Sequence, residues 1–175
     1  ANNSGTINAS GTFTSTGDIG ANGSSFTTFN VNANNKTISF GGDSYINSLS
    51  FKSNTGSTLV IADGKKFVGN IITTAVSGGI IDLSASSVAI TGNIGSSGNS
   101  IAAITIGSAS GAKTLTYQGS AYVTTTTFGH SGSSLVLNGT LNGDIVASNN
   151  NYGTIEVSGS STITGNIGVS NSNAI

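Results

Sequence analysis

The sequence predicts an all-β protein: a parallel β-solenoid of about seven coils with roughly 25 residues in each. Three observations predict this fold, namely evenly spaced short apolar clusters, a recurrent Gly-(Asn/Asp)-Ile triplet, and a longer block that occurs twice. We expect the coils to wind as a right-handed β-helix. We also expect residues 1–175 to form a single β-solenoid segment of a longer rod.

The strands are predicted from short apolar clusters that are bounded by Gly, Asn or Ser. Each cluster alternates or runs for three to five residues, which is typical of short strands between turns. Strong helix formers are scarce and Gly interrupts every stretch, so no window predicts a helix. An apolar share of 35% argues against a disordered linker. The clearest clusters are 37–40, 59–61, 80–83, 104–106, 135–137 and 155–157.

The corners of the coils are predicted from the Gly-(Asn/Asp)-Ile triplet. Its intervals of 52, 23, 51 and 22 residues are single or double periods of one repeat. Gly and Asn tolerate positive φ and form compact polar turns, so they suit a corner from which Ile returns to the core. The triplets begin at Gly17, Gly69, Gly92, Gly143 and Gly165.

A block of about 75 residues, or three short periods, appears twice and begins a third time. Inward side chains of such stacked coils should form apolar ladders at the sheet spacing of about 4.8 Å. The matches are 36–40 with 113–117 at an offset of 77, 57–61 with 133–137 at an offset of 76, and the hexapeptide Ile-Thr-Gly-Asn-Ile-Gly at 90–95 and 163–168.

The composition excludes several classes of protein. Without Cys and with a single His, the chain predicts no zinc site, thiol enzyme or other metal or cofactor centre. Charged residues make up only 6% of the chain, against about 25% in an average domain, and the five Lys are scattered. We therefore expect no nucleic-acid partner. No apolar run approaches the length of a transmembrane helix.

The ionisable residues predict no catalytic site. We interpret His130 as a loop residue and not as a general base, because no carboxylate lies within ten residues of it. The repeat makes Asp18 equivalent to Asp144, and Asp82 equivalent to Glu156. Equivalents one 75-residue block apart would be three coils, or roughly 14 Å, from each other, beyond the 5–10 Å of a glycosidase pair. Asn replaces Asp in other triplets, which favours a corner-forming role.

Three weaker motifs have structural interpretations. The segment 41–43 (Gly-Gly-Asp) is a fragment of the calcium-binding nonapeptide, but the remaining pattern is missing. The pair Lys65-Lys66 could bind an anion, and we favour a solvated turn. Tyr45 and Tyr122 occupy matched repeat positions and could stack on sugars, whereas we favour a structural aromatic ladder or rim.

The Gly/Asn/Ser/Thr-rich, Cys-free sequence, its repeated Ile-Thr-Gly-Asn-Ile-Gly hexapeptide and the segment 133–139 resemble autotransporter passenger domains. They are most similar to the large rickettsial surface antigens of the outer-membrane protein B type. The resemblance covers essentially the whole chain and is one of style and repeat. It implies a secreted right-handed β-helix, held at the cell surface by a C-terminal membrane barrel, that acts as an adhesin or surface layer. We expect any such anchor to lie outside these residues.

We therefore expect a non-enzymatic, extracellular or bacterial cell-surface protein that acts as a rigid adhesin or surface-layer segment. Its partner would be a host-cell or neighbouring surface protein. The alternative is a self-assembling extracellular filament subunit, whose uncapped coils stack end to end on copies of itself. The chain lacks the residues that an enzyme acting on polysaccharide would need. It also lacks the Thr-x-Thr repeat in every coil that an ice-binding solenoid would need.

Overall fold

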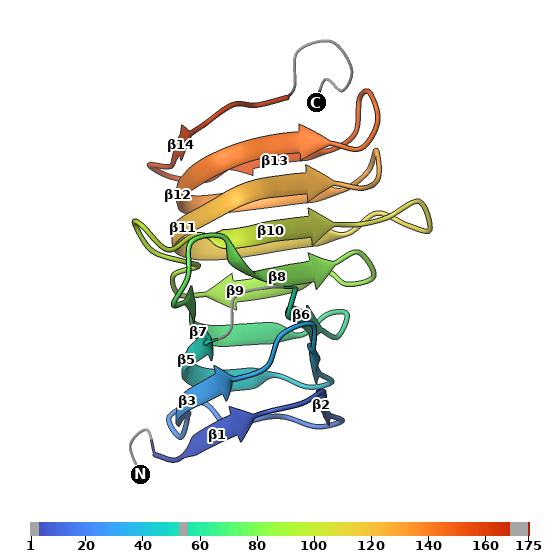
Figure 1. Cartoon of the computed structure of the whole chain (residues 1–175). Helices are drawn as coiled ribbons and strands as arrows, with labels where there is room; N and C mark the ends of the chain where they lie inside the picture. The colour runs from blue at the N-terminus through green and yellow to red at the C-terminus, as the bar shows by residue number, and fades with distance from the viewer. Residues whose placement is uncertain (1–3, 53–55, 169–174) are drawn as a thin grey trace.

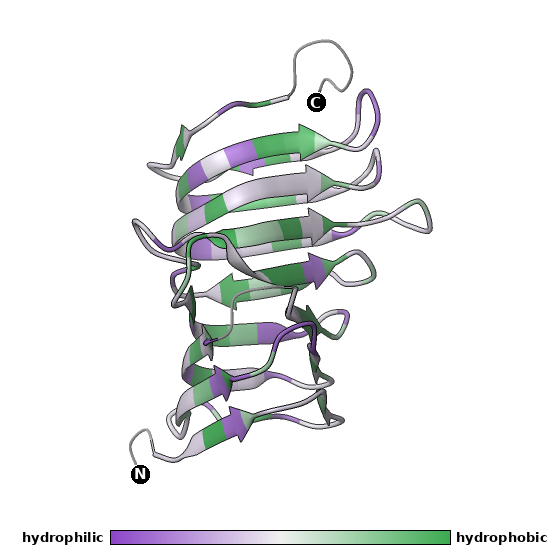
Figure 2. Ribbon diagram, viewed as in Figure 1, coloured by the Kyte–Doolittle hydropathy of each residue, from purple (hydrophilic) through white to green (hydrophobic). Residues whose placement is uncertain are grey.

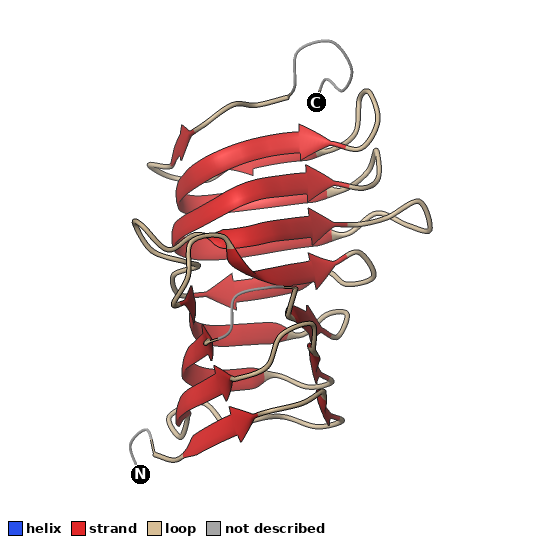
Figure 3. Ribbon diagram, in the orientation of Figure 1, coloured by secondary structure: helices blue, strands red, loops and turns tan. Residues whose placement is uncertain are grey.

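The computed structural model describes residues 4–52, 56–168 and 175, and every regular element in this part of the chain is a β-strand (Figure 3). All pairings between these strands are parallel, so the predicted all-β parallel solenoid is confirmed. The strands are β1 (Thr6–Ala9), β2 (Phe13–Ser15), β3 (Phe26–Val31), β4 (Thr37–Phe40), β5 (Ser44–Phe51), β6 (Thr58–Ile61), β7 (Lys66–Thr73), β8 (Gly78–Leu83), β9 (Val88–Thr91), β10 (Ile101–Ile106), β11 (Thr114–Phe128), β12 (Ser134–Ala147), β13 (Thr154–Val157) and β14 (Thr162–Thr164).

Each coil passes through three sheet faces, which we name A, B and C in chain order. Face A consists of β2, β4, β6, β8, β10 and the last parts of β11 and β12. Face B consists of β9, β13 and the first parts of β5, β7, β11 and β12. Face C consists of β1, β3, β14, the ends of β5 and β7, and the middle of β11 and β12. Figure 1 shows the coils stacked in one column, with β1 and β14 at opposite ends.

The number and length of the coils agree with the sequence. Seven strands follow one another on face A, as expected for about seven coils. Hydrogen bonds between neighbouring coils join residues that are 20 to 27 positions apart. The shortest of these intervals joins β11 to the residue after β12, and both strands turn two corners without a loop.

Inward side chains form the predicted apolar ladders. On face A, Ile38 pairs with Leu59, and Ile81 pairs with Ile104 one coil further on. All four side chains are buried. Burying one such side chain contributes about 1.5–3 kcal/mol, so the stacked ladders are the main source of stability. Hydrophobic segments occur at every level of the stack (Figure 2).

The first coils are filled by aromatic rings. The Phe13 and Phe29 rings meet edge to face with centroids 5.1 Å apart, and Phe29 meets Phe40 in the same way at 5.4 Å. Phe40 then stacks on Phe67 with centroids 6.3 Å apart. These are the preferred geometries of aromatic pairs, and they continue the core into the first coils.

Glycine forms the corner between faces B and C. Gly69, Gly92, Gly119 and Gly139 follow one another in successive coils, with φ between +122° and +159°. A Cβ atom on Gly92 would overlap the carbonyl oxygen of Gly69. Only glycine combines this backbone conformation with so close an approach of two coils.

The two copies of the 75-residue block do not lie directly above one another. Ile38 pairs with Leu59 on face A, whereas its repeat equivalent Leu115 pairs with Val88 on face B. Three coils and one further face therefore separate the copies, one face more than the three periods predicted.

Local contacts nevertheless recur in both copies of the block. Ser57 Oγ accepts a hydrogen bond from the Lys36 N–H, and Ser133 Oγ accepts one from the Lys113 N–H, each at 3.3 Å. Both serines are fully buried. The repeat therefore preserves local structure while it moves around the axis by one face.

The Gly-(Asn/Asp)-Ile triplets consequently occupy three different corners. Ile19 pairs with Ser44 on face B, and Ile71 pairs with Ile94 on face C. Ile145 pairs with the last triplet on face A. Each triplet lies at a corner, as predicted, but the five do not mark the same corner, because the block is longer than a whole number of coils.

Candidate functional site

Asp and Asn side chains at the corners hold neighbouring coils together. Asp18 Oδ1 accepts the Asp43 N–H at 2.8 Å, and Asp144 Oδ1 accepts the Asn166 N–H at the same distance. The same contact recurs where an amide replaces the carboxylate, since Asn70 accepts a backbone N–H one coil further on at 2.9 Å. These bonds satisfy backbone donors at the corners and agree with the predicted corner-forming role.

The carboxylate pairs expected from the repeat are not equivalent in the structure. Asp82 lies on β8 in face A, whereas Glu156 lies on β13 in face B. Asp18 lies at the corner before face B, and Asp144 lies at the corner before face A. The predicted equivalence is wrong, because the additional face rotates the second copy of the block.

His130 lies in the turn between β11 and β12. Its Nδ1 accepts a hydrogen bond from the Gly132 N–H at 3.0 Å, and its ring is tilted against Tyr152 with centroids 6.1 Å apart. Both contacts organise the turn, as expected for a loop residue.

Tyr45 and Tyr122 have matching backbone contacts but lie on different faces. The Tyr45 N–H donates to the Ile19 carbonyl at 2.8 Å, and the Tyr122 N–H donates to the Ile94 carbonyl at 2.7 Å. Tyr45 pairs into face B and Tyr122 pairs into face C. The two residues therefore do not form an aromatic ladder with each other.

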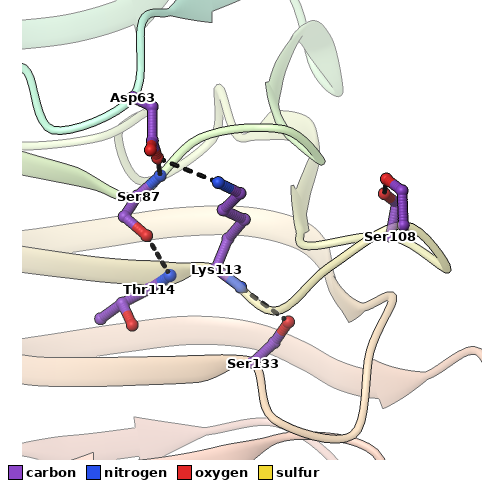
Figure 4. A network of polar contacts seen from close by, with 7 residues as sticks. Asp63, Ser87, Ser108, Lys113, Thr114 and Ser133 are labelled. Atoms are coloured by element: carbon purple, nitrogen blue, oxygen red, sulfur yellow. Dashed lines mark hydrogen bonds and ion pairs between the residues drawn. The ribbon is translucent and has the colours of Figure 1, made fainter.

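A series of polar contacts follows the corner between faces A and B through four coils (Figure 4). Asp63 Oδ1 accepts the Ser87 N–H at 2.6 Å and lies 3.2 Å from Lys113 Nζ. Ser87 Oγ accepts the Thr114 N–H at 3.1 Å, and Ser133 continues the series. The Ser87 N–H and then the Lys113 ammonium lower the pKa of Asp63 below its usual value.

An open depression of about 450 Å³ lies on face B beside this polar series. The register stacks Lys66, Ala89 and Thr116 as consecutive outward residues on β7, β9 and β11. Ala89 has the shortest of these side chains, so the sheet surface is hollow above it. Ser87 and Thr114, whose contact Figure 4 shows, line the depression.

Lysine and aspartate form the rim of the depression. Lys66 Nζ is 3.6 Å from Asp43 Oδ2 and lies 5.4 Å above the centre of the Tyr45 ring. A hydrogen bond with Tyr45 and the charge of Asp43 raise the pKa of Lys66. Lys65 also lines the depression, and among the described residues it has no ion pair.

Local sequence patterns do not reveal this depression. They favour a solvated turn at Lys65-Lys66 and a calcium-motif fragment at 41–43, whereas Asp43 and both lysines line one depression in the structure. The feature that indicates the depression is the small residue Ala89, which lies one coil beyond Lys66. Its position next to Lys66 becomes known only when the register of β7 and β9 is known.

In the described part of the chain, no three His, Asp or Glu side chains are close enough to hold a metal ion. No helix there is long and apolar enough to cross a membrane. The fold thus defines the chain as a three-faced parallel β-solenoid with an open depression on one face. Comparisons with models of protein families, with curated proteins and with solved structures found no match to this chain.

Proposed function

We propose that this chain is a rigid, non-enzymatic segment of an extracellular or bacterial cell-surface protein, acting as an adhesin or as part of a surface layer. The observation that carries the proposal is an outward column on face C with one uncharged polar residue in each of eight successive positions. A flat column of hydroxyl and amide groups suits an extended contact with a partner surface. Its members are Thr6, Thr28, Ser48, Asn70, Asn93, Ser120, Thr140 and Thr162.

Two further features support this proposal. The parallel strands pair from coil to coil, which gives a stiff spacer whose sides keep a fixed spacing. Asp18 and Asp144 are engaged as hydrogen-bond acceptors from the neighbouring coil, which favours a structural use of these carboxylates over acid–base chemistry.

The adhesin hypothesis is tested with beads that carry the purified 175-residue chain. We expect them to bind cultured host cells, or bacteria of the species that produces the chain, more strongly than beads that carry the heat-unfolded chain. Equal binding of the two bead types to every cell type would overturn it. A double variant, Ser48→Lys and Thr140→Lys, would show whether face C is the contact surface, because it places charge in the neutral column.

A filament subunit is the second candidate function, and the last described coil favours it. Val157 and Ile167 occupy ladder positions but are each 54% exposed. Among the described strands, β13 and β14 pair only with β12, so their other edges are available for another coil. A second copy could continue the ladders by parallel strand addition.

Negative-stain electron microscopy across a concentration series tests the filament hypothesis. Long uniform fibres that disappear in the Val157→Lys variant would establish end-to-end stacking as the mode of assembly. Dispersed short rods at every concentration would reject it and leave the adhesin hypothesis standing.

A further inference from the structure

We propose that the face-B depression binds an anionic saccharide, with a sugar ring over Ala89 and its carboxylate or sulfate group at Lys65. The proposal deepens the adhesin hypothesis, because it supplies a ligand class for a protein displayed at a surface. The volume of about 450 Å³ lies within the usual range of small-molecule sites.

The charges around the depression select a single anionic group. Lys66 is paired with Asp43 at 3.6 Å, and Lys113 is paired with Asp63 at 3.2 Å. Among the described residues, Lys65 has no such partner, and its side chain is only partly exposed. One unpaired ammonium group in an open depression attracts one carboxylate or sulfate and gives little attraction for a polyanion.

The uncharged groups of the depression suit the rest of a sugar. The hydroxyls of Thr114 and Thr116 each offer a donor and an acceptor, as sugar hydroxyls require. The oxygen of Ser87 already accepts the Thr114 N–H, and its own hydrogen is available to donate. The Ala89 methyl supplies a small apolar patch for the C–H face of the ring.

The neighbouring contacts keep the site open and in place. The bond from the Thr114 N–H to Ser87 Oγ and the bond from the Ser87 N–H to Asp63 Oδ1 fix the wall of the depression across three coils (Figure 4). Elsewhere on the rim, Asp43 and the Tyr45 ring contact the Lys66 ammonium from the coil before it, whereas Ala89 lies in the coil after it. These contacts favour a position of the Lys66 side chain away from Ala89, so little rearrangement is needed for binding.

The test is a titration of the isotope-labelled chain, followed by amide chemical shifts, with methyl β-glucuronide, its neutral analogue methyl β-glucoside, and sodium sulfate. We expect glucuronide to shift amides in the segments 64–66, 87–89 and 114–116, with a dissociation constant in the millimolar range. Glucoside should bind at least about threefold more weakly, because it lacks the charged contact. Sulfate alone should shift only the amides next to Lys65.

Two variants separate the roles of charge and shape. Lys65→Gln should weaken glucuronide binding about threefold to tenfold and leave glucoside binding unchanged. Ala89→Leu fills the depression and should abolish the binding of both sugars. Lys52→Gln, which removes the lysine directly after β5, and Ala103→Leu, which enlarges an outward alanine on face A, are the matched controls. Unchanged shifts elsewhere in each spectrum show that the variant is folded.

Three outcomes would overturn the saccharide site. The first is the absence of localised amide shifts at glucuronide concentrations up to about 50 mM. The second is sulfate binding as tight as glucuronide binding, and the third is sugar binding that persists in Ala89→Leu. The titration uses free sugar and no cells. If the chain binds the sugar but its beads do not bind cells, the result counts against the adhesin hypothesis alone. If the beads bind cells but the chain does not bind the sugar, the result counts against this site alone.

Discussion

The coil formed by β12 and the last described coil have similar residues at the same ladder positions, but they bury them differently. Leu137 is fully buried, whereas Val157, which pairs with it one coil further on, is 54% exposed. The same contrast holds for Ile145 at 0% and Ile167 at 54%. β12 pairs with strands on both sides, while β13 and β14 pair on one side only among the described strands.

This difference shows that a coil is not a self-sufficient unit. Residue type alone does not determine burial, because an aliphatic side chain at a ladder position is covered by the coil above and the coil below. The loss of stability caused by a substitution should therefore depend more on the position of the residue in the stack than on the type of residue that is replaced. Four predictions, each a substitution compared with the parent or with a control, test this comparison.

The largest effect is expected where the backbones of two middle coils approach closely. Gly92→Ala would force a positive φ on alanine and drive its Cβ into the Gly69 carbonyl oxygen. We expect a loss of roughly 2–6 kcal/mol in the free energy of unfolding, measured by urea denaturation followed by circular dichroism. Gly111→Ala, in an open turn with no atom within 4 Å of the added Cβ, should change it by less than about 0.5 kcal/mol. Equal effects of the two variants would contradict close packing at the B–C corner.

The second prediction compares the two coils directly. Leu137→Ala removes a buried side chain that is covered on both sides, so we expect a loss of about 2–5 kcal/mol. Val157→Ala, at the equivalent position of the last described coil, should cost less than about 1 kcal/mol. The measurement is the same urea titration. A large effect of Val157→Ala in dilute protein would mean that another part of the molecule covers the last described coil.

A smaller effect is expected at the one tyrosine in the core of the middle coils. The Tyr117 hydroxyl donates to the Thr140 carbonyl at 3.0 Å, and burial raises the pKa of this hydroxyl. Tyr117→Phe should cost about 0.5–1.5 kcal/mol at neutral pH, because the carbonyl loses its donor. Folding opposes ionisation here, so this group's contribution should be lost as pH rises above about 10. A stability difference between the two proteins that is the same at pH 7 and at alkaline pH would contradict this.

The smallest effect is expected outside the core, at Asp63. Its pKa is lowered in the folded state by the Ser87 N–H and Lys113. The charged carboxylate therefore stabilises the fold at pH values above the ordinary Asp pKa of about 3.9. This contribution is lost as pH falls through the lowered pKa. Asp63→Asn should therefore unfold slightly more easily than the parent at pH 7, and the difference should vanish in acid. Thermal melts between pH 7 and 2 measure it, and a difference that is independent of pH would exclude a role for the charge.

The sequence predicts the strands and corners well because each depends on a few adjacent residues. Alternating apolar residues such as Leu59 and Ile61 define a strand locally, and both are fully buried. The face or corner at which a given residue lies depends instead on the length of the loop at each preceding corner. β11 and β12 turn their corners without loops, so counting Gly-(Asn/Asp)-Ile triplets placed Asp144 at the wrong corner.

The candidate site illustrates the same limit. Lys66, Ala89 and Thr116 are neighbours across coils, and no local pattern links them. A shift of register by one residue would turn Ala89 inward and remove the depression, because successive residues of a strand point to opposite sides. Only knowledge of which residues lie above one another identifies such a site.

The one-face offset between the two copies of the block gives the rod the symmetry of a screw. Asn70 holds the corner before face C, and Asp144, one block further along the chain, holds the corner before face A. Each further block would advance the pattern by one face, or a third of a turn, and a fourth block would lie above the first. A straight partner laid along one edge therefore meets each corner motif over only part of its length. A partner that winds around the rod with the same pitch would meet the motif in every block.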